Sequence, residues 1–114
     1  MAPAERNDHP TYDLKKIQAM VRVGLYDIRK SAQDAARALA LTERDIRKCI
    51  CSLNHRCTCD GGHFYKSMEA EHPAAKGRGL WQDVYRVGYK HFVLYVKLQH
   101  PSDGRPVVIS FKEK

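Results

Sequence analysis

Hydrophobic residues near the start of the chain recur with helical spacing. They stand at i, i+3 and i+7 on one face: Leu14, Ile17 and Val21. This spacing predicts a helix, with Asp13 or Thr11 as its N-cap and Gly24 at its end. The polar residues 1–12 that precede it include Pro3 and Pro10, and they predict a frayed leader.

Two capping-box patterns predict the starts of two more helices. Residues 31–34 and 42–45 both begin with Ser or Thr and carry Asp three positions later, where its carboxylate reaches back to the N-cap backbone. We expect the second helix to run from Ser31 to about Leu41. The third helix should bury the face formed by Ile46, Cys49 or Ile50, and Leu53.

The pattern changes after Gly61 and Gly62. Phe, Tyr, Val and Ile become frequent and alternate with polar residues, which predicts β-strands. Gly88 allows a tight hairpin, and the sequence PSDG at residues 101–104 predicts a turn. We expect four strands, over residues 63–69, 80–87, 89–99 and 106–112.

The alternation assigns a face to each side chain of the last two strands. One face is apolar and should be buried: Phe92, Leu94, Val96 and Leu98, then Val107, Ile109 and Phe111. The other face is mostly polar: His91, Val93, Tyr95, Lys97 and Gln99, then Val108, Ser110 and Lys112. Helices followed by consecutive strands predict an α+β fold, with the N-terminal helices packed on one face of a C-terminal antiparallel sheet. The length fits a single domain, residues 1–114.

Charge and hydropathy narrow the classes of function. The chain carries 20 Lys plus Arg against 13 Asp plus Glu, a net charge of +7, and its pI is about 9.4. This balance favours a polyanionic partner, most often a nucleic acid, although a basic surface without such a partner gives the same composition. The longest apolar run, residues 92–96, is too short to span a membrane, and the N-terminus lacks the apolar stretch of a signal peptide. We therefore expect a cytoplasmic protein.

The open face of the predicted sheet gathers cations and a tyrosine. Its candidate residues come from all four strands: Lys66, Gln82, Arg86, Tyr95, Lys97 and Lys112. Cations bind phosphates and tyrosine rings stack on bases, so this face suits RNA. It also suits RNA cleavage, in which a ribose 2′-OH attacks its own phosphorus with a proton acceptor, a proton donor and cations on the phosphorane. A solvated basic surface is the plain alternative.

Four segments in the second half of the chain resemble one family of toxins. They are FYKSM (64–68), WQDVYR (81–86), LYVK (94–97) and SFKEK (110–114). This set resembles the MqsR family, the motility quorum-sensing regulator toxins of bacterial toxin–antitoxin pairs. The resemblance is strong over residues 63–114 and covers the helical half in outline. It implies a RelE-like fold, cleavage of messenger RNA without the ribosome, and a cognate MqsA-like zinc-binding antitoxin.

The resemblance also implies roles for individual residues. The family's proposed active-site residues fall on Lys66, Gln82, Tyr95 and Lys112. The expected RNA contacts are Tyr65, Arg86 and Lys97. Trp81 is expected in the core. Three loops are longer than the family pattern and bear on which nucleotides flank the cut: residues 54–62, 71–79 and 99–106.

Four cysteines lie in one short window: Cys49, Cys51, Cys57 and Cys59. Their spacing departs from that of structural zinc sites, and on a helix Cys49 and Cys51 point about 200° apart. Disulfides are disfavoured in the cytosol. We expect reduced thiols, no metal site and no cofactor, with zinc binding or a redox role as the alternative.

Three functions are open, and the resemblance favours the first of them. The leading hypothesis is a metal-independent endoribonuclease toxin. A non-catalytic RNA- or DNA-binding module would use the same basic face, and a partner-docking regulator would accept an added strand at an open sheet edge. A binder needs cations and rings, whereas an enzyme needs the Tyr95 hydroxyl and Lys66 for the chemistry.

Overall fold

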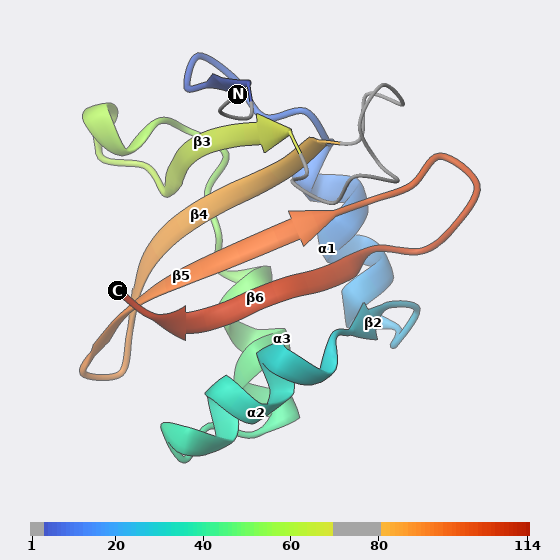
Figure 1. The fold of residues 1–114 in the computed structure, drawn as a ribbon, viewed down its shortest axis with the longest axis vertical. Coiled ribbons are helices and arrows are strands. Elements are labelled where there is room, and N and C mark those ends of the chain that lie inside the picture. Colours follow the sequence, from blue (N-terminus) through green and yellow to red (C-terminus); the bar gives the residue numbers. More distant parts are fainter. Residues whose placement is uncertain (1–3, 70–80) are drawn as a thin grey trace.

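The computed structural model describes residues 4–69 and 81–114, in which helices cover one face of a sheet (Figure 1). These residues form three α-helices: α1 (Leu14–Arg22), α2 (Lys30–Ala38) and α3 (Glu43–Cys51). They also form six strands: β1 (Glu5–Arg6), β2 (Asp27–Ile28), β3 (Phe64–Glu69), β4 (Trp81–Tyr89), β5 (Phe92–Gln99) and β6 (Val107–Glu113). The strand order is β1-β3-β4-β5-β6-β2, antiparallel throughout except for the β2–β6 pair. The predicted α+β class is confirmed.

The core lies between the helices and the sheet. Its fully buried side chains come from α1, α3 and the central strands, and include Ile17, Val21, Ile46, Ile50, Phe64, Tyr85, Leu94, Val96 and Phe111. Each large apolar side chain buried in this way contributes about 1.5–3 kcal/mol. Gln18 is a buried polar side chain between α1 and α3, and its Nε2 donates to the carbonyls of Ile50 (2.9 Å) and Leu53 (3.0 Å). These bonds satisfy carbonyls at the end of α3.

Helices α1 and α3 begin as their sequences predict. Asp13 caps α1 by accepting a hydrogen bond from the backbone N–H of Lys15 (3.0 Å), and Gly24 follows the helix in left-handed backbone (φ 80°). Thr42 and Asp45 form the expected capping box of α3. Both predictions are confirmed because each signal is local to the helix end.

The capping box expected at Ser31 is absent, because α2 starts one residue earlier. Arg29 is the N-cap and makes no side-chain cap bond. Its backbone N–H donates instead to the carbonyl of Val108 in β6 (3.0 Å). This bond continues the β2–β6 ladder and so fixes where the helix begins. The helix ends before Leu41, since Ala40 adopts left-handed backbone (φ 59°) and turns the chain.

The four expected strands are present as β3 to β6, with shifted ends. Residue 80, the first of one expected strand, lies outside the described residues. Gly88 does not form the hairpin turn; it pairs with Val93 inside the β4–β5 ladder. The turn is made by Lys90 and His91, and Lys90 takes the left-handed backbone (φ 54°) that a tight hairpin requires. Strands β1 and β2 were not predicted, because two residues are too few to show an alternation.

A β-bulge in β6 changes which residues face the core. Leu98 pairs with Val108, and the next pair skips Ile109. Val108 therefore packs in the core cluster, where Val107 and Ile109 were expected. The prediction was wrong for Val107 and Val108, because one extra residue inverts a two-residue period on one side of it. Ile109, the extra residue itself, is buried as predicted but lies outside the core cluster. On the other side of the bulge Phe111 faces the core as predicted.

The N-terminal segment is bound to the sheet. β1 pairs with β3, and the backbone N–H groups of Thr11 and Tyr12 donate to the two oxygens of the Asp83 carboxylate, at 2.9 Å each. Asp83 is fully buried on β4, opposite the core residue Leu98. A buried carboxylate needs such donors, since an unpaired charge in the interior is costly. The frayed leader expected over residues 1–12 is therefore wrong for the part that the structure describes.

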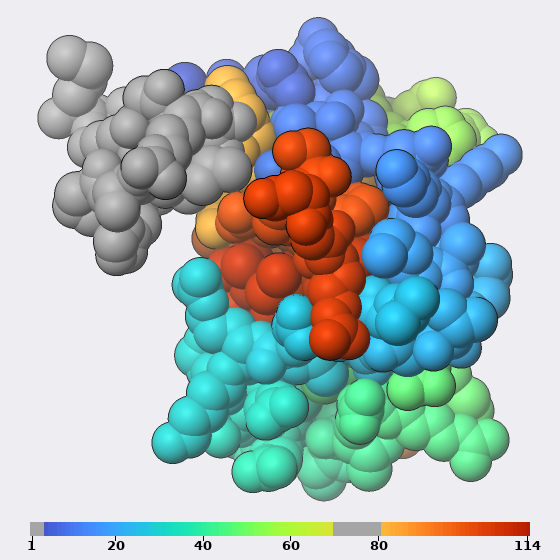
Figure 2. Space-filling view, turned by 90° about the vertical axis from the view of Figure 1, so that its right-hand side faces the viewer, coloured from blue at the N-terminus to red at the C-terminus, as the bar shows by residue number. Residues whose placement is uncertain are grey.

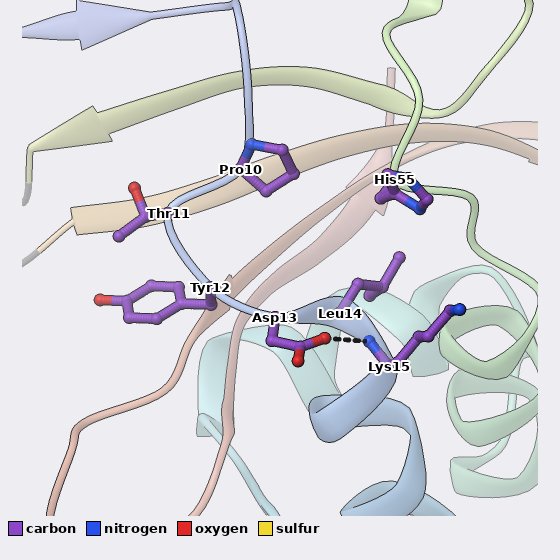
Figure 3. A pocket seen from close by; sticks show the side chains of 7 residues that line it. All are labelled: Pro10, Thr11, Tyr12, Asp13, Leu14, Lys15 and His55. Carbon is purple, nitrogen blue, oxygen red and sulfur yellow. Dashed lines mark hydrogen bonds between the residues drawn. The ribbon is translucent and has the colours of Figure 1, made fainter.

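A depression of about 300 Å³ lies where this segment enters α1 (Figure 3). It is lined by Pro10, Thr11, Tyr12, Asp13, Leu14, Lys15 and His55. Its polar groups already serve the fold, because Asp13 caps the helix and the Tyr12 hydroxyl donates to the carbonyl of Trp81.

Trp81, which was expected in the core, lies outside the core cluster with the Arg6 guanidinium 4.6 Å from its ring centroid.

The loop between α3 and β3 carries two of the cysteines. Cys57 and Cys59 form a disulfide across the 3-10 turn Thr58–Asp60, with their Cα atoms 5.2 Å apart. The expectation of reduced thiols is wrong for this pair, because the turn brings the two Cα atoms within the range that a disulfide needs. Cys49 and Cys51 are free, as expected.

The turn between β5 and β6 lies at the surface. Figure 2 shows it (orange-red) standing out above α2 (cyan) and α3 (green). The predicted turn at residues 101–104 is confirmed, since the N–H of Gly104 donates to the carbonyl of Pro101 (3.2 Å). The loop at residues 71–79 lies outside the described residues. Within residues 4–69 and 81–114, every helix is too short or too polar to cross a membrane.

Candidate functional site

The face of the sheet opposite the helices is polar. Arg86 of β4 pairs with Tyr95 of β5, and Tyr95 in turn pairs with Lys112 of β6. Residues paired in this way project from the same face with their Cβ atoms about 5 Å apart. The three strands therefore present a row of two cations with a tyrosine between them. The polar sheet face comprises Tyr65, Lys66, Gln82, Arg86, Tyr95, Lys97 and Lys112.

A bulge in β3 brings Lys66 to the polar sheet face. Phe64 faces the core, and a regular ladder would place Lys66 opposite the buried Asp83, on that same core face. Lys66 instead pairs with Val84, so Tyr65 is the extra residue. The bulge reverses the alternation of side chains along β3, so both Tyr65 and Lys66 lie on the polar sheet face.

A depression of about 300 Å³ occupies the middle of the polar sheet face. Its lining includes three of the four catalytic residues predicted from the sequence: Lys66, Tyr95 and Lys112. The other lining residues are Tyr65, Met68, Val84, Lys97 and Ser110. Three lysine side chains thus share one concave surface with two tyrosine rings. Such a surface suits a ligand that carries both negative charge and aromatic rings.

The two tyrosines of this depression form one aromatic wall with Arg86. Tyr65 and Tyr95 stack with ring centroids 6.0 Å apart and 29° between their planes. The Arg86 guanidinium lies 5.0 Å from the Tyr65 centroid and 5.5 Å from the Tyr95 centroid. Stacking and cation–π contacts hold these three side chains in a fixed relation. The wall offers positive charge and ring surface, as the expected RNA contacts should.

Gln82 lies on the polar sheet face but outside the depression. It pairs with Met68 of β3, and its Nε2 donates to Oε1 of Gln99 (3.2 Å). The side chain is largely buried, with 9% of the residue exposed. Among the predicted catalytic residues it is the one that the structure does not bring to the depression.

Glu5 of β1 is a site residue that sequence reasoning missed. Lys66 Nζ donates to both oxygens of the Glu5 carboxylate, at 3.0 and 3.1 Å. A second depression on this face, of about 330 Å³, adjoins the one in its middle, the first depression, and shares Lys66 and Tyr65 with it. Its lining is Glu5, Arg6, Asn7, Tyr65 and Lys66. No local signal could have revealed Glu5, because its place depends on the pairing of β1 with a strand some sixty residues away.

Other titratable groups lie apart from the polar sheet face. Within residues 4–69 and 81–114, no group of three or more His, Cys, Asp or Glu side chains is placed to hold a metal ion. Cys49 lies in the core, and burial raises the pKa of its thiol to about 12, so the reactive thiolate is disfavoured. His63 Nδ1 accepts a hydrogen bond from the backbone N–H of Asn54 (2.9 Å), and burial lowers its pKa.

The fold and the polar sheet face define a small α+β protein with one cationic, aromatic surface. A family model described as "Motility quorum-sensing regulator, toxin of MqsA" matches residues 9–113, nearly the whole chain. The chain therefore belongs to this MqsR toxin family, and it is the toxin of a toxin–antitoxin pair whose antitoxin is named MqsA in the family description. The comparison with curated proteins found no match. The family predicted from the four motifs is confirmed.

Proposed function

We propose that the chain is a ribosome-independent endoribonuclease that cleaves messenger RNA at the polar sheet face and so inhibits translation and growth. Membership of a toxin family supports the toxic outcome. The composition of the face supports RNA as the target. The proposed site of action is the cytoplasm, and the proposed partner is an MqsA-like antitoxin that binds zinc.

The observation that carries this proposal is the shared depression of Tyr95 with three lysines. Lys66, Lys97 and Lys112 line it together, and each ammonium would stabilise negative charge on a phosphate. Tyr95 supplies an ionisable hydroxyl in the same space. Tyr65 also lines this depression, and with Arg86 beside it offers a stacking surface for a base.

The proposed reaction is a transesterification within the RNA. The 2′-oxygen forms a bond to phosphorus, and the bond from phosphorus to the 5′-oxygen of the next nucleotide breaks. The 2′-hydroxyl gives its proton to a base, and the leaving 5′-oxygen receives a proton from an acid. The products are a 2′,3′-cyclic phosphate and a free 5′-hydroxyl. Every atom of the reaction is supplied by the RNA and by side chains.

Each predicted residue has one role in this scheme. Tyr95 transfers a proton, and Lys66 and Lys112 hold the charge of the phosphorane. Gln82 orients the phosphate by hydrogen bonding, for which its side chain must leave Gln99. The RNA contacts are Tyr65, Arg86 and Lys97.

The experiment that tests the proposal is cleavage of a defined mRNA by the purified protein in EDTA, with the cut ends mapped. We expect cleavage that ends in a 2′,3′-cyclic phosphate and a 5′-hydroxyl. Loss of cleavage in EDTA would contradict the metal-independent mechanism. An mRNA left intact with and without added divalent cations would contradict the enzyme assignment.

A non-catalytic RNA- or DNA-binding module is the second candidate. The contact of Arg86 with both Tyr65 and Tyr95 favours it, because such a wall serves binding without any reaction. The same mRNA experiment separates the two functions. A bare binder retains the RNA in a mobility-shift assay and leaves its length unchanged.

A further inference from the structure

Glu5 brings a negative charge to the border of the polar sheet face. It stands opposite Met68 at the β1 edge of the sheet, and both its carboxylate oxygens accept a hydrogen bond from Lys66 Nζ. Glu5 lines the second depression and is absent from the lining of the first. Its charge therefore contacts the lysine from outside the space in which a phosphate would bind.

The ion pair restricts where the Lys66 ammonium lies. A lysine side chain has four rotatable carbon–carbon bonds, and an unpaired ammonium samples many positions. Here the ammonium contacts the Glu5 carboxylate on one side and lies 5.6 Å from the Tyr65 ring centroid. An ammonium has three N–H donors, so a donor is left for a phosphate oxygen after Glu5 is bound.

Glu5 is itself firmly placed. β1 pairs with β3, and the N–H of Glu69 donates to the carbonyl of Ala4 (2.8 Å) beside it. Further along the chain, Thr11 N–H binds the buried Asp83 carboxylate. The segment that carries Glu5 is thus held at both ends, by backbone pairing with β3 at one end and by the Asp83 carboxylate at the other.

We propose that Glu5 is a positioning residue, which holds the Lys66 ammonium at the edge of the first depression for contact with the reacting phosphate. This role rests on the proposed endoribonuclease function. It predicts that removal of the Glu5 charge slows the reaction. An acidic group that merely blocked the face would have the opposite effect, because its removal would speed the reaction.

The test is steady-state cleavage of a defined RNA by Glu5→Gln. We expect kcat to fall about tenfold or more, because a small displacement of a catalytic group is costly. KM should stay the same or fall, since one negative charge beside the RNA is removed. Glu5→Asp keeps the carboxylate and should recover part of the lost kcat. Asp34→Asn removes an equal charge from an exposed position on α2, which lies on the opposite side of the sheet, and it should leave kcat unchanged.

A second pair of variants shows whether Glu5 acts through Lys66. In a Lys66→Met background, Glu5→Gln should change the residual rate by less than about twofold, because the lysine that it positions is gone. Melting curves of all variants check that β1 is intact. Unchanged or higher kcat in Glu5→Gln would overturn the positioning role, as would a full further loss in the Lys66→Met background. Absence of cleavage by the unsubstituted protein would overturn the proposed function itself.

Discussion

Tyr95 and Lys112 are directly paired across β5 and β6, and both line the depression in the middle of the polar sheet face. Their relative position is set by the backbone ladder of two long strands rather than by a loop. A backbone ladder varies little, so the phenol and the ammonium approach a bound phosphate in a constant geometry. The pair is therefore the natural place to test the proposed chemistry.

Replacing Tyr95 by Phe tests the proton-transfer role. The change removes one hydroxyl and keeps the ring, so the stack with Tyr65 and RNA binding should survive. Loss of general acid–base catalysis should lower the cleavage rate by about 10²–10⁴-fold. Single-turnover cleavage measures the rate, and a binding titration on uncleavable RNA measures the affinity. A rate within twofold of the original would remove Tyr95 from the mechanism.

A 2′-deoxy substitution at the cut site tests the nucleophile. The proposed attack needs the 2′-hydroxyl, so the substituted RNA should resist cleavage altogether while the same RNA with an intact ribose is cut. Product analysis on a denaturing gel measures both. Cutting of the 2′-deoxy substrate would show that water, and not the ribose, attacks the phosphorus.

Lys66→Ala should abolish growth arrest. Expression of the unsubstituted chain alone should stop bacterial growth, whereas the variant lacks the ammonium that faces the depression. Lys16→Ala is the matched control, because it removes the same charge from an exposed position on α1. Growth curves at equal protein level, checked by immunoblot, provide the measurement. Equal toxicity of Lys66→Ala and the unsubstituted chain would rule out a catalytic Lys66.

The family description names an antitoxin, and this partner should be encoded beside the toxin. We expect purification of the tagged chain from its native operon to return a small cysteine-bearing protein bound to it. A basic toxin surface calls for acidic groups on the partner, so the affinity should weaken as the salt concentration rises. Recovery of the bare toxin from cells that express both genes would contradict the prediction.

Local signals predicted the fold where a helix end contains its own determinants. The N-cap Asp13 and the capping box at Thr42 act within four residues, so the sequence revealed them. The start of α2 was missed because it depends on the bond from Arg29 to Val108 in β6. A helix start fixed by a distant strand leaves no mark in the neighbouring residues.

In the candidate site, too, the sequence revealed what neighbouring residues determine and missed what a distant strand determines. Alternation along β5 placed Tyr95 and Lys97 correctly, since β5 itself carries no extra residue. Lys66 was a candidate for this face from the residues, and the family resemblance assigned its catalytic role. The alternation of its own strand could not establish its face, because the bulge at Tyr65 inverts that alternation. A bulge is defined by the partner strand's register, and a single strand's sequence does not contain that register. Glu5 was missed for this reason too.

The dependence of folding stability on pH should reveal protonation of the His63 side chain. Burial lowers the pKa of its imidazole in the folded protein, so the unfolded chain binds the proton more readily. Stability is therefore full above the ordinary pKa of histidine, near 6.5, and falls as the pH drops below it. Melting curves at pH 7.5 and pH 5.5 should show a smaller drop for His63→Gln than for the unsubstituted protein. An equal drop in both would place the titration elsewhere.

Asp83→Ala should release the N-terminal segment from the sheet. The backbone N–H groups of Thr11 and Tyr12 both bind this buried carboxylate, and each orphaned donor costs about 1–3 kcal/mol. Urea unfolding should therefore show a clear loss of stability, whereas the exposed Asp103→Asn should unfold like the unsubstituted protein. Hydrogen exchange locates the effect, because the amides of Thr11 and Tyr12 should lose protection before those of the central strands. Protection at both amides in Asp83→Ala would mean that β1 pairing alone holds the segment, and that the carboxylate is dispensable to the strand that carries Glu5.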